Sequence, residues 1–199
     1  ILPPKIAPVQ IIIIPIFYGD KSKEEILNKV KTVVKELNEE GLRAEYDLRE
    51  GYTPGWKFNE WEMKGVPIRI EVGPRDIDNN NIIIVRRDLN KKDVIPIADS
   101  KQHIASLLDD IQLELFEQAK TFLKSNTTFV QTYTDFKSTI KKGGFVECGW
   151  DGNPETEKKI KKETKATIRC IPFEQKISEL KCVYTNTEAK YRVIFARAY

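Results

Sequence analysis

The sequence predicts an α/β protein built from two units, and three features indicate this. A β-branched apolar run at residues 11–14 is followed by a segment whose apolar residues recur at helical spacing. Strand and helix patterns then alternate, which is the order of an α/β domain. A long helical pattern at residues 99–123 precedes a second set of alternating patterns. We therefore expect a first domain with a linker helix at residues 1–125 and a small α/β domain at residues 126–199.

The elements of the first domain follow from their apolar patterns and stop signals. Residues 9–16 form a β-branched run that predicts a central, buried strand. Ser22 can cap the first helix, and Gly41 ends it. Residues 66–72 alternate apolar and polar positions, which predicts a strand with one buried and one polar face. The other expected elements are a strand at residues 42–47, a helix from the Pro54-Gly55 turn to about Gly65, and a strand at residues 81–87.

The linker helix and the second domain are predicted in the same way. One apolar face of the linker helix comprises Ile104, Leu107, Leu108, Ile111, Leu115, Ala119 and Phe122. The second domain is expected to contain helices at residues 133–141 and 155–165 and strands at residues 144–148, 166–172, 181–184 and 191–196. Candidates for its core are Phe145, Trp150, Ile160, Ile168, Ile171, Phe173 and Phe195.

Composition excludes several classes of protein. The chain is 40% hydrophobic and 32% charged with a net charge of +3, a balance that neither requires nor excludes a nucleic acid. The apolar start, residues 1–16, is interrupted by prolines and is shorter than the roughly 20 residues of a membrane-spanning helix. It also lacks the flanks of a signal peptide. Three widely spaced cysteines favour a reducing cytoplasm. Because the first residue is not Met, we expect a fragment or a processed product.

No sequence motif for catalysis is present. The chain contains no GxxxxGK[ST] loop, no HExxH and no nucleophile elbow, so we expect no catalytic residue in it. A thiol enzyme using Cys148 or Cys170 is an alternative, but a nucleophilic cysteine needs a basic partner. The single histidine, His103, lies in the expected linker helix and is a poor candidate for that basic partner.

Aromatic and charged side chains are densest between residues 47 and 76. Aromatic faces can stack on unpaired bases, at about 1–3 kcal/mol per base. A carboxylate suits guanine, whose N1–H and exocyclic amine are adjacent donors, and arginine can donate to the acceptors of the same base or to phosphate. Structural roles compete with this interpretation. We expect Trp56 and Trp61 in the core rather than as base platforms, and Arg69 and Glu71 can form a cross-strand ion pair.

The same segment carries a resemblance to a known family. The run PGWKFNEWEMKGVPIRIEVGPRD, preceded by DLRE and followed by IIIVRRD, resembles the anticodon-binding domain of prolyl-tRNA synthetases of the archaeal and eukaryotic type. APVQIIIIPI near the start and DDIQLELFEQA in the long helix also fit. TKATIRCIPFE and KYRVIFARAY resemble the C-terminal domain of that family. The resemblance covers essentially the whole chain and implies a mixed five-stranded sheet with helices, followed by a small α/β domain.

The resemblance implies roles for individual residues. Phe58 occupies a position that stacks on an anticodon base, and Glu62 and Arg69 occupy positions that read a guanine. Arg75 and Asp76 fall where the neighbouring guanine is contacted. All proline anticodons share two guanines, so two guanine sites are what the function requires. Weaker candidates for phosphate contact, for which a solvated surface charge is an equal alternative, are Lys57, Arg49, Arg86 and Arg87.

Many members of this family hold a structural zinc ion with four cysteines in the C-terminal domain. Here Cys148 and Cys182 match two of these positions, while Thr156 and Tyr184 stand at the other two. A tetrahedral thiolate site needs all four ligands, or histidine in place of one. We therefore expect a zinc-free descendant of the domain, with Cys170 in a buried apolar role. In the family, the terminal carboxylate of a residue matching Tyr199 reaches toward the synthetase active site.

The resemblance also implies the activity of a longer parent protein. Such a protein is a proline--tRNA ligase, which joins proline to its tRNA with ATP and Mg²⁺ in the cytoplasm. This chain would bind the anticodon stem-loop of tRNA(Pro), and its other partners would be a catalytic domain of the same chain and a second subunit. No cofactor of its own and no membrane are implied. A protein-interaction module is the rival interpretation; it would keep the fold and discard Glu62, Arg69 or Asp76.

Overall fold

The computed structural model describes residues 1–17, 19 and 22–197. The chain divides into two compact units, Ile1–Gln118 and Ala119–Tyr199, and each is described by itself. The predicted domain boundary at residue 125 falls at the last residue of the helix that contains this division. Among the described residues, none of the helices has the length and apolar character needed to cross a bilayer.

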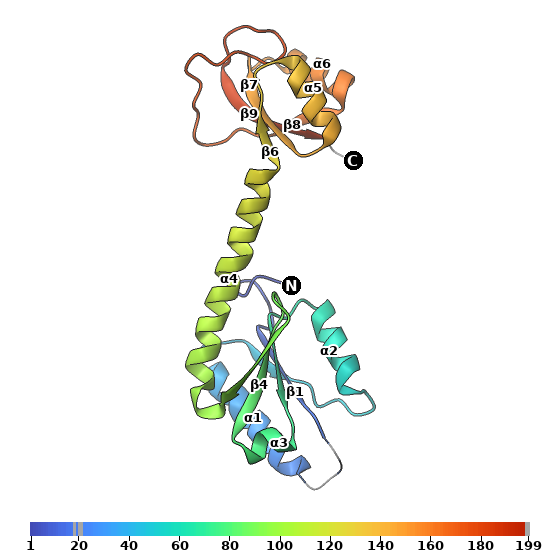
Figure 1. Cartoon of the computed structure of the whole chain (residues 1–199), viewed down its shortest axis with the longest axis vertical. Helices are drawn as coiled ribbons and strands as arrows, with labels where there is room; N and C mark the ends of the chain where they lie inside the picture. Colours follow the sequence, from blue (N-terminus) through green and yellow to red (C-terminus); the bar gives the residue numbers. More distant parts are fainter. Residues whose placement is uncertain (18, 20–21, 198–199) are drawn as a thin grey trace. The chain divides into compact units, whose positions relative to one another are not determined.

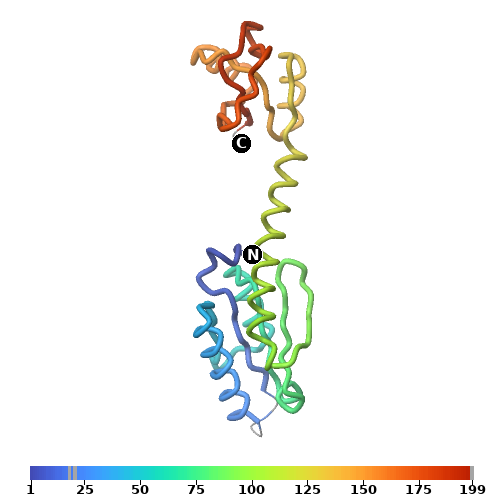
Figure 2. Tube along the Cα trace, turned by 90° about the vertical axis from the view of Figure 1, so that its left-hand side faces the viewer, coloured from blue at the N-terminus to red at the C-terminus, as the bar shows by residue number. Residues whose placement is uncertain are grey.

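The first unit contains the mixed five-stranded sheet that the sequence predicts (Figure 1). Its strand order is β2-β1-β3-β4-β5, with β1 parallel to both β2 and β3. The strands β4 and β5 form an antiparallel hairpin, drawn in green in Figure 2. The strands are β1 (Ile11–Pro15), β2 (Ala44–Tyr46), β3 (Ile68–Val72), β4 (Asn81–Arg86) and β5 (Lys91–Pro96).

Helices cover both faces of this sheet because the side chains of β1 alternate between two cores. Ile11 and Ile13 point into the larger core, beneath α1 (Lys23–Glu39) and the first part of α4 (Ser100–Ser125). Ile12 and Ile14 point into a smaller core with Val66, which Phe58 and Trp61 of α2 cover. The helix α2 (Pro54–Met63) begins at Thr53, whose side chain accepts a hydrogen bond from Trp56 N. The short elements are α3 (Pro74–Asp78) and the 3-10 helix Ile97–Asp99.

Three expectations for this unit are wrong. The strand β3 has no exposed polar face; Arg69 and Glu71 are buried because α2 covers that side and because the two side chains pair with each other. Trp56 is not in the core but is 44% exposed. Only the first four residues of the predicted apolar face of the linker helix are buried, and Phe122 is exposed, because α4 continues beyond the core of the first unit.

The second unit is the small α/β domain that the sequence predicts. Its sheet has the order β6-β7-β9-β8, in which β6 is parallel to β7 and the other pairs are antiparallel. Phe136 of α5 and Ile160 of α6 pack with Phe195 of β9 in one core. The elements are β6 (Thr127–Phe129), α5 (Tyr133–Lys142), β7 (Phe145–Trp150), α6 (Pro154–Thr164), β8 (Ala166–Cys170) and β9 (Tyr191–Arg197).

Several expectations for the second unit are also wrong. No regular strand forms at residues 181–184, where only isolated bridges are present. Cys170 is exposed at the end of β8 rather than buried. Ile171 and Phe173 are exposed because they follow β8 in a loop instead of continuing the sheet.

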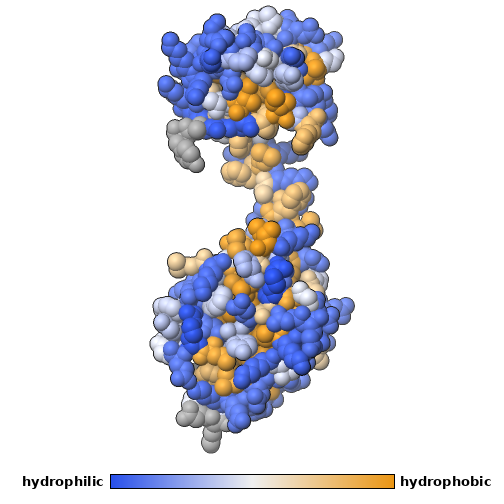
Figure 3. Space-filling model, turned by 180° about the vertical axis from the view of Figure 1, so that it is seen from behind, coloured by the Kyte–Doolittle hydropathy of each residue, from blue (hydrophilic) through white to orange (hydrophobic). Residues whose placement is uncertain are grey.

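The surface in Figure 3 is largely hydrophilic, with apolar patches on each unit.

Candidate nucleic-acid interface

The helix α2 and the strand β3 bring an aromatic ring, an arginine and two glutamates into one cluster. The Arg69 guanidinium lies over the Phe58 ring, 4.0 Å from its centroid. Arg69 Nη1 donates to Glu62 Oε1 at 2.7 Å, whereas Nε and Nη2 donate to Glu71 Oε1 at 3.2 and 3.0 Å. These contacts leave only 8% of the Arg69 side chain exposed. The predicted site residues Phe58, Glu62 and Arg69 therefore meet in one place. Together with Glu71 they form what we call the Arg69 cluster.

Sequence reasoning missed part of this cluster. The ion pair of Arg69 and Glu71 forms, but within β3 rather than across strands. Glu71 also pairs with Lys92 of β5, on the far side of β4, whose Nζ donates to both carboxylate oxygens at 3.0 Å. Nothing in the sequence of β5 marked Lys92, because its contact depends on the hairpin register. Two carboxylates and two cations thus balance one another around the Phe58 ring.

Arg87 lines the same narrow gap as Phe58, Glu62 and Arg69, a gap with no room for a water molecule. Its Nη1 lies 3.8 Å from Glu62 Oε2. Its Nε is buried without a hydrogen-bond partner among the residues that the structure describes. The Glu62 side chain remains 28% exposed. The part of the Arg87 guanidinium that is exposed and the partly open Glu62 carboxylate can together satisfy an acceptor and a donor of a ligand.

Arg86, the neighbouring candidate, has a structural role instead. Its guanidinium donates to Asp88 at 2.9 and 2.6 Å and to Glu114 of α4 at 2.8 Å. The hydrogen bonds to Asp88 raise the pKa of Arg86 and lower that of Asp88. This network joins the end of β4 to α4, so it accounts for the burial of Arg86 without a ligand.

The second predicted pair, Arg75 and Asp76, lies in α3. Asp76 Oδ2 accepts a hydrogen bond from Gly73 N at 2.7 Å, so the carboxylate caps the helix start. The Arg75 side chain is exposed and has no side-chain partner in the described part of the chain. Asp76 therefore has a local structural role, whereas Arg75 is open to solvent.

A second cluster surrounds Asp47, directly after β2. Its carboxylate accepts from Arg49 at 3.0 and 2.6 Å and from Trp61 Nε1 at 2.8 Å. Lys57 Nζ donates to the Asp47 backbone carbonyl at 3.2 Å and lies 3.8 Å from Oδ1. Lys57 is consequently not a solvated surface charge, since its side chain is 7% exposed. Arg49 also pairs with Glu60 and remains partly exposed.

The electrostatics of Asp47 favour its charged form. Burial alone would raise the pKa of this carboxyl group, but the hydrogen bonds from Arg49 and Trp61 outweigh it and hold the pKa well below its usual range. The hydrogen bonds that Arg49 donates to Asp47 and to Glu60 raise the pKa of Arg49. Asp47 thus anchors α2, the helix that carries Phe58 and Glu62, to the end of β2.

The four positions that match zinc ligands in the family do not form a zinc site here. Cys148 and Cys182 are buried, but Thr156 Oγ1 donates to Asp151 Oδ2 at 2.8 Å and Tyr184 OH donates to Glu163 at 3.1 Å. A hydroxyl and a phenol that donate to carboxylates cannot replace thiolates. Within the described residues, no three His, Cys, Asp or Glu side chains gather to hold a metal ion.

The cysteines also lack the properties of a nucleophile. Burial raises the pKa of Cys148, and the nearby Cys182 raises it further, so the thiol stays protonated. Cys170 is exposed on β8, and His103 lies on α4 in the other unit. Tyr199, whose carboxylate was expected to reach toward an active site, lies outside the described residues.

Comparison with known proteins identifies the family. Residues 10–107 match the anticodon binding domain, and residues 133–199 match the prolyl-tRNA synthetase C-terminal domain. The chain thus comprises an anticodon-binding domain and a prolyl-tRNA synthetase C-terminal domain. The match to the C-terminal domain is consistent with the archaeal and eukaryotic type that the sequence resembles. The Arg69 cluster and the Asp47 cluster both lie in the part that matches the anticodon binding domain.

Individual relatives agree with this assignment. The chain is 43% identical over 199 residues to a proline--tRNA ligase of Porphyromonas gingivalis. It is 44% identical over 200 residues to proline--tRNA ligase 2 of Clostridioides difficile and 45% identical over 199 residues to a proline--tRNA ligase of Rubrobacter xylanophilus. Each alignment covers all of this chain, but the chain spans only 40–41% of the length of these relatives.

Proposed function

We propose that this chain reads the two guanines of the proline anticodon for a proline--tRNA ligase. The observation that carries the proposal is the Arg69 cluster, in which charged side chains are already fixed beside an aromatic ring. Glu62 Oε1 is occupied by Arg69, but Oε2 has only the longer contact with Arg87. Oε2 and the remaining lone pair of Oε1 can accept from N1–H and the exocyclic amine of a guanine, while Arg87 supplies a donor for an acceptor of the same nucleotide.

The ring of Phe58 supports the position of the base. It packs against the smaller core on one side and beneath Arg69 on the other. Because both faces are covered, we assign Phe58 to a contact through the edge of its ring, in place of the stacking that the resemblance implies, with Arg69 holding the Glu62 carboxylate toward the base. Lys57 and Arg49 contribute by fixing α2 through Asp47.

The second guanine is assigned to α3. Asp76 has one oxygen engaged with Gly73 N, which leaves the other for the donors of a base. The exposed guanidinium of Arg75 can donate to the same base or to its phosphate. Each of the two proposed sites contains one carboxylate and one or two guanidinium groups. Two such sites match the two guanines of the anticodon.

The remaining assignments concern the longer protein. We assign to it the activity named for the relatives, in which proline is joined to tRNA(Pro), with ATP and Mg²⁺ used by a catalytic domain. In that protein the present chain supplies binding energy far from the reacting atoms, which can position the acceptor end of the tRNA. A homodimer and a cytoplasmic location belong to the same proposal.

The proposal is tested by RNA binding at fixed salt. The 199-residue chain is titrated with a proline anticodon stem-loop and with the same stem-loop carrying adenine in place of both guanines. We expect the guanine loop to bind more tightly. Glu62→Gln, which keeps the shape but removes the charge, should reduce this preference by about 5- to 150-fold, equivalent to roughly 1–3 kcal/mol for a bidentate base contact.

A matched control removes the same charge elsewhere. Glu39→Gln on α1 changes an exposed carboxylate whose one ion-pair partner among the described residues is Lys35, and we expect it to keep the guanine preference. Equal binding of both loops by the unmodified chain would contradict the proposal and favour an interaction module. Loss of the guanine preference in both variants would show that this preference depends on the net charge of the chain rather than on the Glu62 contact.

A further inference from the structure

A pair of aromatic side chains lies exposed at the start of α2. The Tyr52 and Trp56 rings stack with their centroids 4.0 Å apart and their planes at 22°. They remain 47% and 44% exposed, respectively. Neither the Tyr52 hydroxyl nor the Trp56 indole N–H has a hydrogen-bond partner among the described residues. An ordered aromatic pair in contact with solvent is unusual for a structural role, since packing would normally bury such area.

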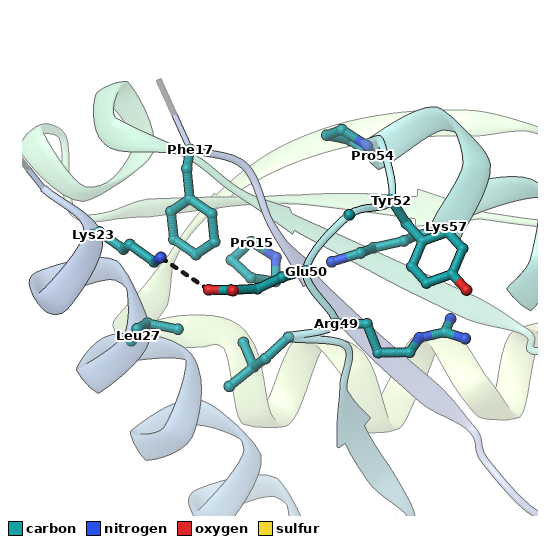
Figure 4. Close-up of a pocket in the computed structure, with 11 residues that line it drawn as sticks. Pro15, Phe17, Lys23, Leu27, Arg49, Glu50, Tyr52, Pro54 and Lys57 are labelled. Atoms are coloured by element: carbon teal, nitrogen blue, oxygen red, sulfur yellow. Dashed lines mark hydrogen bonds and ion pairs between the residues drawn. The ribbon is translucent and has the colours of Figure 1, made fainter. Parts of the chain in front are cut away.

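Tyr52 of this pair lines a cleft of about 640 Å³, a size typical of small-ligand sites, whereas its stacking partner Trp56 lies outside that lining. The cleft opens beyond the carboxyl ends of β1 and β2, between the first turns of α1 and the segment that leads into α2. Ligands of open α/β sheets bind in crevices outside the carboxyl ends of the strands. Figure 4 shows Tyr52 and Lys57 on one side of it and Lys23 on the other, with the Glu50 side chain extending toward Lys23.

The cations of the cleft are already neutralised. Arg49 lies 5.3 Å from the centroids of both rings, but its guanidinium pairs with Asp47 and Glu60. Lys23 pairs with Glu50 across the cleft at 3.2 Å, as the dashed line in Figure 4 marks. A free phosphate therefore meets little net positive charge here. What the site offers a ligand is an aromatic surface, held in place by Arg49.

We propose that Tyr52 and Trp56 form a second nucleotide subsite, which stacks one unpaired base of the RNA loop at the mouth of this cleft. The inference rests on the proposed function, because it assumes that the ligand is the same RNA. Trp56 and Glu62 are six residues apart on α2, or about 9 Å along the helix axis, so one loop can reach both. Stacking does not select a base, so this subsite adds affinity without guanine preference.

The test uses the 199-residue chain with the two stem-loops described above, each titrated at several salt concentrations. Trp56→Ala should weaken binding of the guanine loop and of the adenine loop by the same factor, about 5- to 150-fold. The dependence of log Kd on log salt concentration should not change, because no phosphate contact is lost. Trp56→Phe, which keeps an aromatic face, should recover most of the affinity. Thermal unfolding of each variant confirms that the fold is retained.

Three results would overturn the subsite. They are unchanged affinity of Trp56→Ala, a smaller salt dependence, and a loss confined to the guanine loop. The first would leave the exposed pair as a surface for a protein partner, and the last would make Trp56 a residue that positions Glu62. Failure of the proposed function is separable from these outcomes. It shows as equal binding of the two loops by the unmodified chain, whereas the subsite is judged by the effect of Trp56→Ala on the guanine-free loop.

Discussion

Replacing Asp47 by alanine should destabilise the first unit more than any exposed substitution. The change removes the acceptor of hydrogen bonds from Arg49 and Trp61, and it leaves the buried ammonium of Lys57 without a counter-charge. Loss of one partner of a buried ion pair costs about 3–5 kcal/mol, since the remaining charge stays desolvated. The cost of leaving the Trp61 N–H without an acceptor is included in that range and is not added to it, because the contacts share one carboxylate.

The measurement is urea unfolding followed by tryptophan fluorescence in a Trp150→Phe background. The remaining tryptophans, Trp56 and Trp61, both belong to α2, so the signal reports the first unit. Glu50→Gln is the matched control: this carboxylate also follows β2, but it is 86% exposed and should change the free energy of unfolding by less than about 0.5 kcal/mol. A loss of under about 1 kcal/mol for Asp47→Ala would refute the reasoning that Asp47 anchors α2.

Three further predictions follow from individual contacts. Because the folded-state pKa of Asp47 is lowered, its charged form stabilises the fold above about pH 4, and the stability difference between the unmodified chain and Asp47→Asn should shrink as the pH falls from about 5 toward 2 in urea titrations. Gly149→Ala should cost the second unit about 1–3 kcal/mol in calorimetry, because the new Cβ would lie 2.3 Å from the Lys181 carbonyl oxygen; a neutral effect would contradict this packing. A zinc chelator should leave the unfolding midpoint of the second unit unchanged, since Cys148 and Cys182 have no further thiolate partner; a lowered midpoint would reveal a bound metal.

Local patterns were sufficient for the strongest elements. The isoleucine run of β1 and the amphipathic face of α1 are specified by residues close in sequence, and both form as predicted. The strand β5, with the sequence KKDVIP, was missed because an exposed edge strand has no apolar alternation to recognise. The strand expected at residues 181–184 was wrong because the two buried residues there, Cys182 and Val183, belong to a loop, which isolated bridges join to Gly149 and Glu188.

The candidate site was predictable only where side chains act within one motif. Phe58, Glu62 and Arg69 belong to one run of sequence, and the resemblance placed them together before the structure did. The partners Asp47 and Lys92 could not be recognised in the same way. Their contacts depend on where α2 docks and on the register of the β4–β5 hairpin, which are long-range features.

The arrangement explains how a chain of net charge +3 can be suited to RNA. Around α2, most cations are paired with carboxylates before any ligand arrives, as Arg69 is with Glu62 and Glu71, and Arg49 is with Asp47. Binding then gains little from counterion release and depends on groups that are already oriented. Such a surface discriminates by leaving a base donor or acceptor unpaired when the wrong base is present. The salt dependence of binding should accordingly be shallow, with a slope far smaller than the number of lysines and arginines in the domain would allow, and a steep slope would show that phosphate contacts dominate instead.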